Sequence, residues 1–379
     1  MSSRRGWARA QVGGGSGVPA PQAVRPCLSS PPRTTLKPIA PDEGLAMSIY
    51  HHSTELSDEA LDQAATAALR APSIFNTQPW RWRIHDGVAE LRAERERQLR
   101  VVDPQGRLLT MSCGVALHHL RAALAASGMK VDVARLPERD DPDLLARVRV
   151  TGAEEPTSAA IRHYQALLTR HTDRRLFQRT PVRAETLEGV RAVVEANGAH
   201  LDVVRPDQVM ALIVAADRAA AVEITDAAYR AELAGWTHRP PGSGDGVPDA
   251  TMVPPVPRRV ALRDFLLDGM SKLAPGDGDD RGATYAILFT AGDEPFSWLQ
   301  AGEALGAALV AAVEHGAAAS PMSDLVEVAQ TRETLRRMLA GIGHPMIVLR
   351  IGLVDAVAAV PAAPRRGPES VIERDAQPE

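Results

Sequence analysis

The spacing of apolar residues predicts alternating helices and strands, in two successive rounds. In the first round, Ser57 is placed to cap a helix that Pro72 ends, because a proline ring disfavours helical geometry in the preceding residue. Trp80, Trp82 and Ile84 alternate with arginines, which is the spacing of a strand. Other helical segments are expected at 114–128, 185–197, 206–233 and 297–316, and other strands at 131–133, 148–150, 201–204, 285–289 and 346–351.

An internal repeat accompanies this order of elements. The segment from Cys113 to Gly128 aligns with the segment from Ala301 to Gly316 at a constant offset of 188 residues (302 − 114 and 316 − 128). Alanine-rich helices also match by chance, so the alignment gains weight from the similar elements on either side. The sequence therefore predicts two similar units, at 47–155 and 156–354.

Three segments differ in composition from these units. Residues 1–46 are rich in Gly, Pro and Ser and are expected to be disordered, and residues 355–379 are expected to be a surface tail. Residues 235–282 contain a Pro- and Gly-rich stretch and the sequence GDGDDRG, which are too polar for a core. Long irregular loops within a compact protein usually serve as lids or are disordered, so this insertion is expected to be lid-like.

Composition and charge exclude several classes of protein. The 379 residues, 45% hydrophobic and 24% charged, are typical of a soluble globular protein larger than one ordinary core. A net charge of -4 gives no electrostatic reason to expect nucleic acid, and no uninterrupted apolar run predicts a membrane span. Two cysteines, Cys27 and Cys113, form no metal-ligand spacing, so no metal is expected and the cytoplasm is the predicted location.

The segment APSIFNTQPW, residues 71–80, carries the most specific motif. It joins a predicted helix to a predicted strand and gathers the polar residues Ser73, Asn76, Thr77 and Gln78 between two prolines. Prolines limit backbone freedom, so such a turn can present hydrogen-bonding groups to a planar heterocycle. An ordinary capped turn explains the composition equally well.

The segment RHTDRRLF, residues 170–177, is the second candidate. Arg170, His171, Thr172 and Arg174 lie close together, and guanidinium groups with a hydroxyl form a suitable phosphate clamp. A solvated basic loop is the alternative. A further basic pair, Arg365–Arg366, means little by itself.

At these residues the chain resembles the nitroreductase superfamily, and in particular its Acg-like branch. APSIFNTQPW resembles the APSxxNxQPW signature, and RHTDRRLF resembles the Arg-x-Ser-x-Arg segment that binds the FMN phosphate, with Thr172 in place of the serine. The order of SCGVALHHL, SPMSDLVEVAQ and PRRGP is similar to that branch, and the resemblance covers roughly residues 56–368. A phenylalanine, Phe75, stands where that branch would have histidine.

The resemblance implies an α+β fold with FMN bound between two units. Each half of this chain has only one of the two motifs, so the fused halves are expected to form an internal pseudo-dimer with one complete FMN site. The resemblance assigns no catalytic side chain. It assigns these residues to FMN: Pro72, Ser73, Asn76, Gln78, Arg170, His171, Thr172, Arg174, Met322, Ser323, Arg365 and Arg366.

The leading interpretation is an FMN-dependent oxidoreductase that transfers electrons from NAD(P)H to a nitroaromatic or quinone-type acceptor. The alternative is a non-catalytic protein that binds or sequesters flavin under a lid. A degenerate homologue that binds nothing is a third interpretation.

Overall fold

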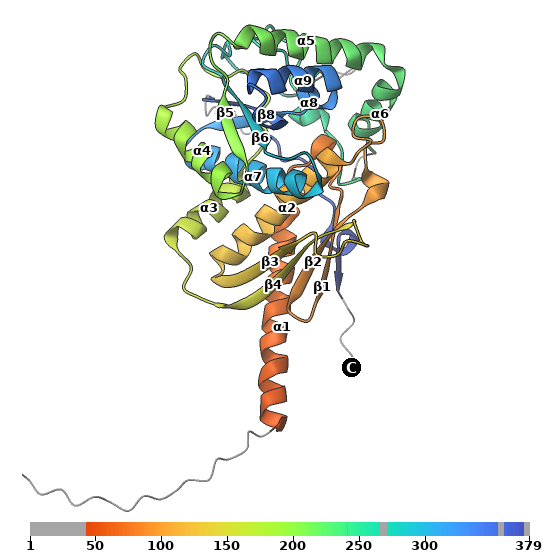
Figure 1. The fold of residues 1–379 in the computed structure, drawn as a ribbon, viewed down its shortest axis with the longest axis vertical. Helices are drawn as coiled ribbons and strands as arrows, with labels where there is room; N and C mark the ends of the chain where they lie inside the picture. The colour runs from red at the N-terminus through yellow and green to blue at the C-terminus, as the bar shows by residue number, and fades with distance from the viewer. Residues whose placement is uncertain (1–42, 241, 266–270, 355–359, 375–379) are drawn as a thin grey trace, which may run out of the picture. The chain divides into compact units, whose positions relative to one another are not determined.

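The computed structural model describes residues 43–240, 242–265, 271–354 and 360–374. The chain divides into two compact units, residues 1–46 and 47–379. Of the first unit, only the first four residues of helix α1 (Glu43–Ala68) are described, so the expectation of disorder for residues 1–42 lies outside the described residues. The second unit contains helices and two sheets, and the predicted α+β class is confirmed (Figure 1).

The first sheet has five strands in the order β3-β4-β2-β1-β9. Its antiparallel strands are β1 (Trp80–His85), β2 (Val88–Ala93), β3 (Met129–Arg135) and β4 (Leu144–Ala153). Trp80 and Trp82 are fully buried on one face of β1, as their alternation with arginines predicted. The C-terminal strand β9 (Ile372–Arg374) pairs in parallel with β1, so the end of the chain joins the sheet built by its beginning.

The second sheet repeats this strand order. Its four antiparallel strands are β5 (His200–Val203), β6 (Thr284–Thr290), β7 (Ala318–Met322) and β8 (His344–Gly352). They lie in the order β7-β8-β6-β5, which corresponds one for one to β3-β4-β2-β1. In both sheets a long helix connects the second strand in the chain to the third: α2 (Arg107–Ala126) follows β2 and α7 (Pro295–Glu314) follows β6.

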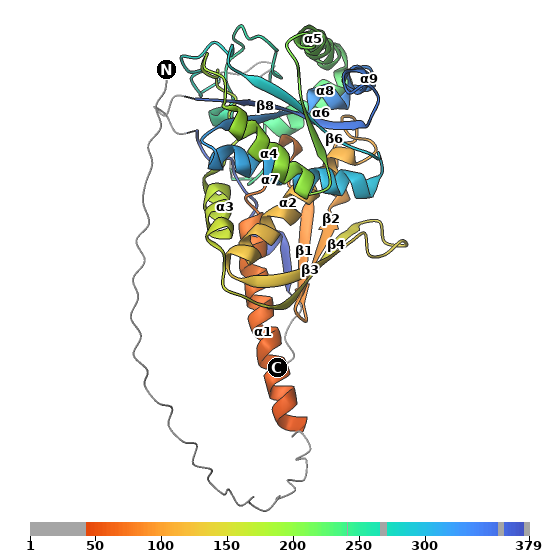
Figure 2. The same cartoon turned by 60° about the vertical axis from the view of Figure 1, so that its left-hand side comes forward.

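Helices α2 and α7 lie side by side between the sheets (Figures 1 and 2). They touch at Gly114 and Gly302, where a Cβ on either glycine would lie 2.9 or 2.8 Å from the Cα of the other. The same Cβ on Gly114 would overlap the carbonyl oxygen of Leu299, and one on Gly302 would overlap that of Met111. These residues are equivalent in the internal repeat, so the contact is reciprocal, as in an interface with two-fold symmetry.

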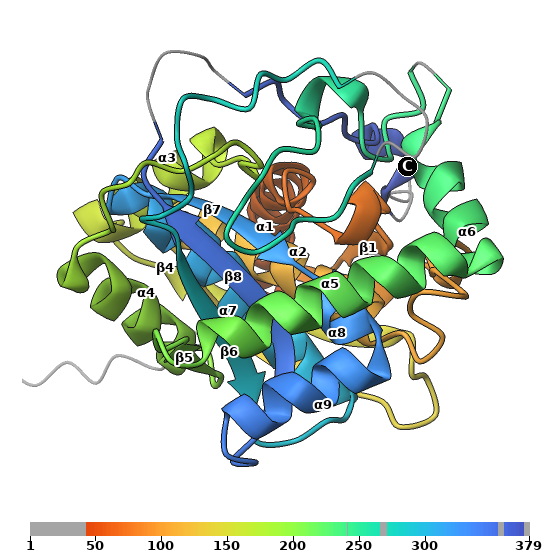
Figure 3. The same ribbon diagram turned by 90° about the horizontal axis from the view of Figure 1, so that it is seen from above.

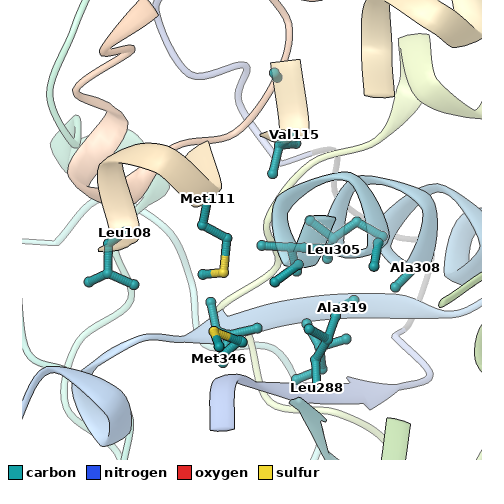
Figure 4. Packing of buried hydrophobic residues seen from close by; sticks show 14 of the residues in the cluster. Leu108, Met111, Val115, Leu288, Leu305, Ala308, Ala319 and Met346 are labelled. Carbon is teal, nitrogen blue, oxygen red and sulfur yellow. The ribbon is translucent and has the colours of Figure 1, made fainter. Parts of the chain in front are cut away.

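The hydrophobic core continues from α2 through α7 to the second sheet (Figure 4). Leu108 and Met111 of α2 and Leu305 of α7 point toward Met346 and Leu288 of the sheet. Helices α5 (Val209–Thr225) and α9 (Ala329–Met338) cover the other face of that sheet (Figure 3). The remaining helices are α3 (Ser158–Thr169), α4 (Ala184–Ala196), α6 (Ala227–Thr237), the single-turn α8 (Asp324–Glu327), and the 3-10 turns Ile74–Asn76, Arg95–Arg97, Asp249–Thr251 and Pro368–Ser370.

Several predicted helix boundaries are wrong. Helix α1 begins at Glu43, so Ser57 lies inside it and does not cap it, and α2 begins seven residues before the expected Gly114. The long helix expected at 206–233 is two helices, because the Asp226 side chain accepts hydrogen bonds from the backbone of Ala228 and Tyr229 and starts a new helix.

Two polar segments are also more ordered than their composition predicted. The described part of the C-terminal tail carries strand β9, and Val371 and Ile372 are buried in the core. Asp280, within GDGDDRG, is completely buried, because its carboxylate pairs with Arg350 and Arg258. A paired carboxylate tolerates burial that composition alone argues against.

Two helices of the described chain, α2 and α7, have the length and hydropathy of a membrane span. Their apolar windows are 83% and 78% buried inside the protein, which is how a core helix meets the same criteria.

We expect Gly302→Ala to lower the free energy of unfolding by about 1–3 kcal/mol, because the new methyl group overpacks the α2–α7 contact. The matched control is Gly235→Ala, an exposed position in α6 with open space around it, where alanine should stabilise the helix by up to about 1 kcal/mol. Urea unfolding measures both. Equal effects would show that the helix contact is not close enough to require glycine.

Candidate functional site

The turn between α1 and β1 has an unusual backbone. Phe75, Asn76 and Gln78 have positive φ angles of 47°, 54° and 48°, in the left-handed region that non-glycine residues avoid. Ser73 Oγ accepts a hydrogen bond from Gln78 N at 2.9 Å, and Ser112 Oγ of α2 accepts one from Ile74 N at 3.2 Å. Such strain persists where surrounding contacts over-determine it, which is typical of a binding site.

Asn76 and Gln78 connect this turn to two distant segments. The Asn76 amide donates to the carbonyl oxygens of Gly246 and Pro364 at 2.9 and 3.1 Å. The Gln78 amide donates to the carbonyl oxygen of Gly244 at 2.8 Å and accepts from Arg366 N at 3.0 Å. Both side chains are therefore used inside the protein, and neither lines the pocket described next.

A mostly apolar pocket of about 600 Å³, partly open to solvent, lies beside the turn. It brings together residues far apart in the chain: Pro72 and Ser73 from the turn, Thr172 and Arg174 from the basic segment, and Ser323 after β7. The remaining lining residues are Ile74, Phe75, Leu108, Met111, Ser112, Val115, Phe265, Leu305, Pro321 and Ile347. The structure thus joins the two sequence motifs at one site.

Arg174 lies at the edge of this pocket. Its guanidinium is 4.8 Å from the centre of the Phe265 ring and donates to the carbonyl oxygen of Thr251 at 3.3 Å. Burial, with the nearby charge of Arg263, lowers the pKa of Arg174 to about 10. The guanidinium is thus turned toward the insertion as well as the pocket.

Arg170 and Arg365 carry buried donors without partners among the described residues. These are Nε and Nη1 of Arg170 and Nε of Arg365. Burial lowers the pKa of Arg170 to about 9, and the charge of Arg365 adds to this effect. Two cations placed near each other with unused donors are unfavourable without an anion, so this pair is a candidate site for one.

The neighbouring predicted residues are placed differently. Arg366 donates to Glu94 at 2.6 Å and to the Gln78 carbonyl oxygen, so of the two C-terminal arginines only Arg365 has buried donors to spare. His171 lies 3.5 Å from Asp173, with 39% of its side chain exposed. Met322 is buried at the end of β7 and pairs with Val348 in the sheet, whereas Ser323 reaches the pocket.

A buried charged cluster next to the pocket was missed from sequence. Arg263, in the insertion, pairs with Glu223 and Glu327 at 2.9 and 2.6 Å, and the Tyr229 hydroxyl lies within hydrogen-bond distance of both carboxyl groups. Its guanidinium also lies 4.8 Å from the centre of the Phe75 ring. These residues are scattered over 105 positions (327 − 223, counted inclusively), and no local spacing relates them.

Phe265 was also missed. It contacts Phe75 edge-on, with ring centres 6.1 Å apart, and so extends the insertion over the pocket. The one sequence feature that could have identified Phe265 was its place in an apolar run within a polar insertion.

No family model matches the chain, but curated proteins do. It is 36% identical over 322 residues to a Mycobacterium tuberculosis (strain H37Rv) protein named "Putative NAD(P)H nitroreductase", covering 83% of this chain and 91% of that protein. It is 31% identical to the protein named for Acg from the same strain, over 84% of this chain and 97% of that one. The chain belongs to this nitroreductase family. The resemblance read from the two motifs is thereby confirmed.

Further comparisons include an uncharacterized relative and two solved structures. An uncharacterized M. tuberculosis protein is 34% identical over 84% of this nitroreductase-family chain and 94% of its own length. Among solved structures, a Bacteroides fragilis nitroreductase with bound FMN is 12% identical over 52% of this chain and 90% of its own, with a TM-score of 0.33. The Mycobacterium smegmatis nitroreductase NfnB in complex with NADPH is 19% identical over 56% and 97%, with a TM-score of 0.32.

Asp324, directly after the pocket residue Ser323, should make stability depend on pH. Burial raises its pKa to about 7, against the opposing charge of Arg263 and with help from Glu223 and Glu327. A carboxyl whose folded pKa is raised contributes stability below its unfolded pKa of about 3.9, and this is lost as the pH rises to about 7. We therefore expect Asp324→Asn to become more stable relative to the parent as the pH rises from about 4 to about 7, by at most about 1.4 kcal/mol per pH unit.

Urea unfolding at a series of pH values measures this difference. The control is Asp217→Asn, an exposed carboxyl on α5, whose difference from the parent should be small at every pH. An Asp324→Asn difference that does not change with pH would mean that this carboxyl titrates normally.

Proposed function

We propose that the protein is an FMN-dependent oxidoreductase that transfers electrons from NAD(P)H to a nitroaromatic or quinone-type acceptor. One observation carries the proposal. An apolar pocket bounded by the strained turn is also lined by Thr172 and Arg174, which belong to the same segment as Arg170 with its unused buried donors. FMN has the matching chemistry, a planar apolar ring system linked to a phosphate dianion.

Two segments that line the pocket, α2 and the basic segment, continue from the proposed ring end of the site toward the proposed phosphate end. On α2, Ser112 and Val115 line the pocket, and residues three and four apart share a helix face. On the basic segment, Thr172 and Arg174 line the pocket and Arg170 precedes them in extended geometry, with φ −61° and ψ 138°. This continuity supports one elongated ligand across both ends.

We assign the predicted site residues accordingly. Arg170 and Arg365 would hold the phosphate, with Thr172 and His171 beside them. Pro72, Ser73 and Ser323 would contact the ring, with Met322 supplying backbone beneath it and Arg174 closing the edge. Asn76, Gln78 and Arg366 would act by fixing the turn, since their side chains are bonded within the protein.

When bound, FMN supplies the hydride and electron chemistry, and no side-chain nucleophile is required. The residues of this chain would bind and orient the ring, while the apolar surface of Leu108, Met111 and Val115 excludes water from one side. NAD(P)H and the acceptor would enter from the open side of the pocket.

We infer that the chain is a fused pseudo-dimer with one FMN site. The equal strand orders and the reciprocal glycine contact support duplication of one unit. The turn comes from the first unit and the basic segment from the second, and each motif occurs once in the sequence. We assign the protein to the cytoplasm on its composition.

A second candidate function is flavin sequestration under a lid, and the insertion favours it. Phe265 covers part of the pocket. Arg263 pairs with Glu223 and Glu327, two buried carboxylates outside the insertion. Opening the insertion would separate this buried ion pair, which opposes the opening motion.

We expect apoprotein to bind FMN at a ratio near one per chain, and Arg170→Ala and Arg365→Ala to weaken binding about tenfold to a hundredfold through the loss of charge-assisted hydrogen bonds. Quenching of flavin fluorescence during titration measures both. Arg179→Ala, at a side chain 71% exposed and paired with Asp279, is the control and should bind like the parent. Unchanged binding in both site variants, or a ratio near two, would overturn the assignment.

We expect Phe265→Ala to raise the rate of NAD(P)H oxidation with a bulky acceptor more than with a small one, because it removes the ring that narrows the pocket. This substitution is cleaner than shortening residues 242–249, since Gly244 and Gly246 hold the turn through Gln78 and Asn76. Proteins of equal flavin content should be compared, with Lys272→Ala, 71% exposed in the same insertion, as control. Rates equal to the parent with both acceptors would remove the main support for sequestration.

A further inference from the structure

The side chains of the basic segment alternate between the pocket and the protein interior. Thr172 and Arg174 line the pocket, whereas Asp173 and Phe177 are completely buried and Arg175 is nearly so. Such alternation is typical of an extended chain. Beyond the end of α3, however, the segment belongs to no helix or strand. Because no ladder of a sheet fixes this backbone, other contacts must hold it.

Two buried guanidinium groups hold the carbonyl groups of this segment. Arg258, in the insertion, donates to the carbonyl oxygens of Arg174 and Arg175 at 2.7 and 3.4 Å. Arg350, on β8, donates to those of Asp173 and Arg175 at 3.4 and 2.7 Å. Only 5% of the Arg258 side chain is exposed, and none of the Arg350 side chain. Three consecutive carbonyl groups are therefore satisfied by buried side chains in place of a neighbouring strand.

The buried carboxylate of Asp280 orients both guanidinium groups. It accepts hydrogen bonds from Arg350 Nε, at 3.2 Å, and from Arg350 Nη2, and Arg258 Nη1 lies 3.3 Å from its Oδ2. Its Oδ1 also accepts from Phe177 N at 2.6 Å. A guanidinium group is a planar fork of donors, so a carboxylate that binds one side of the fork directs the donors on the other. Asp280 therefore determines where the two arginines point.

The loop that carries Asp280, residues 276–282 (GDGDDRG), lies directly against the basic segment. The backbone N–H groups of Asp279 and Asp280 both donate to the Phe177 carbonyl oxygen, at 3.1 and 3.0 Å. A Cβ on Gly278 would overlap this same oxygen, so the approach requires glycine. Asp280 itself has a φ of 59°, in the left-handed region that aspartate and asparagine tolerate better than most residues. This end of the insertion thus supports the segment that lines the pocket.

We propose that Asp280 is a positioning residue that places Thr172 and Arg174 at the pocket. It acts through the two buried guanidinium groups, which hold three consecutive carbonyl groups of the basic segment. Without the charge of Asp280, two buried cations would face each other without their shared carboxylate, an arrangement that buried groups avoid. The arginines would turn away from the carbonyl groups, and the backbone that directs Thr172 and Arg174 to one side would no longer be fixed.

This proposal rests on the proposed FMN site, and a double-mutant cycle separates the two. The full-length apoprotein is titrated with FMN, and quenching of flavin fluorescence gives the affinity. Asp280→Asn keeps the size of the side chain and tolerates the left-handed backbone but removes the charge. We expect Asp280→Asn and Arg174→Ala each to weaken FMN binding about tenfold. If Asp280 acts by placing Arg174, the double variant should bind FMN within about twofold of Arg174→Ala, whereas independent losses would multiply to about a hundredfold.

Asp279→Asn is the matched control, with the same substitution at the preceding residue of the same loop. The Asp279 side chain is 33% exposed and pairs with the exposed Arg179 and Arg281, so this variant should bind FMN like the parent. Urea unfolding of each apoprotein establishes that the variants are folded.

Arg258→Lys separates positioning from charge balance and serves if Asp280→Asn does not fold. Lysine keeps a positive charge beside Asp280 but lacks the planar fork that bonds a carboxylate and two carbonyl groups at once. We therefore expect Arg258→Lys to weaken FMN binding about tenfold, again with little further loss when Arg174→Ala is added. A role in charge balance alone would leave the Arg258→Lys protein binding FMN like the parent.

The outcomes distinguish failure of the positioning role from failure of the site. Parental FMN affinity in folded Asp280→Asn or in Arg258→Lys, or losses that multiply in the double variants, would overturn the positioning role and leave the FMN site intact. A parent protein that does not bind FMN, or an Arg174→Ala protein with parental affinity, would overturn the proposed site at Arg174 and the positioning role with it.

Discussion

The close approach of α2 and α7 at Gly114 and Gly302 is the contact on which the rest of the structure depends. Without side chains at the crossing, the two backbones meet directly, and a single methyl group on either glycine would overlap the opposite helix. Because each helix packs on a different sheet, this crossing sets how the two sheets meet within residues 47–379. The pocket lies along α2 where residues from both halves of this part of the chain converge, so its shape follows from the same contact.

The buried arginines around the pocket differ in whether they have carboxylate partners. Arg366, Arg263 and Arg350 are paired with carboxylates, which is how buried cations are ordinarily stabilised. Arg170 and Arg365, whose charges affect each other, instead keep unused buried donors. Buried cations with unused donors and no carboxylate partner are costly, which is the physical basis for the proposed anion site.

The insertion at residues 235–282 takes part both in forming the pocket and in limiting entry to it. The carbonyl oxygens of Gly244 and Gly246 accept hydrogen bonds from the strained turn. Arg263 pairs with a buried carboxylate, and Phe265 lines the pocket. The same segment therefore helps to form the site and restricts entry to it. A catalytic protein and a sequestering protein would differ in how often this segment opens, since both need the same pocket.

The sequence by itself determined the α+β class, six of the strands, the internal repeat, and the family through two local motifs. These follow from short-range rules: alternation at Trp80 and Trp82 places a strand, and the prolines around Ser73 restrict a turn. Only the tertiary structure decided that Arg365 and not Arg366 has donors to spare, that the Asn76 and Gln78 side chains hold the turn in place, and that Phe265 lines the pocket. These outcomes depend on partners 100 or more residues away, such as Asn76 and Gly246 at a separation of 170. Local spacing carries no information about such pairs, because burial and partner choice arise only when the sheets and helices pack.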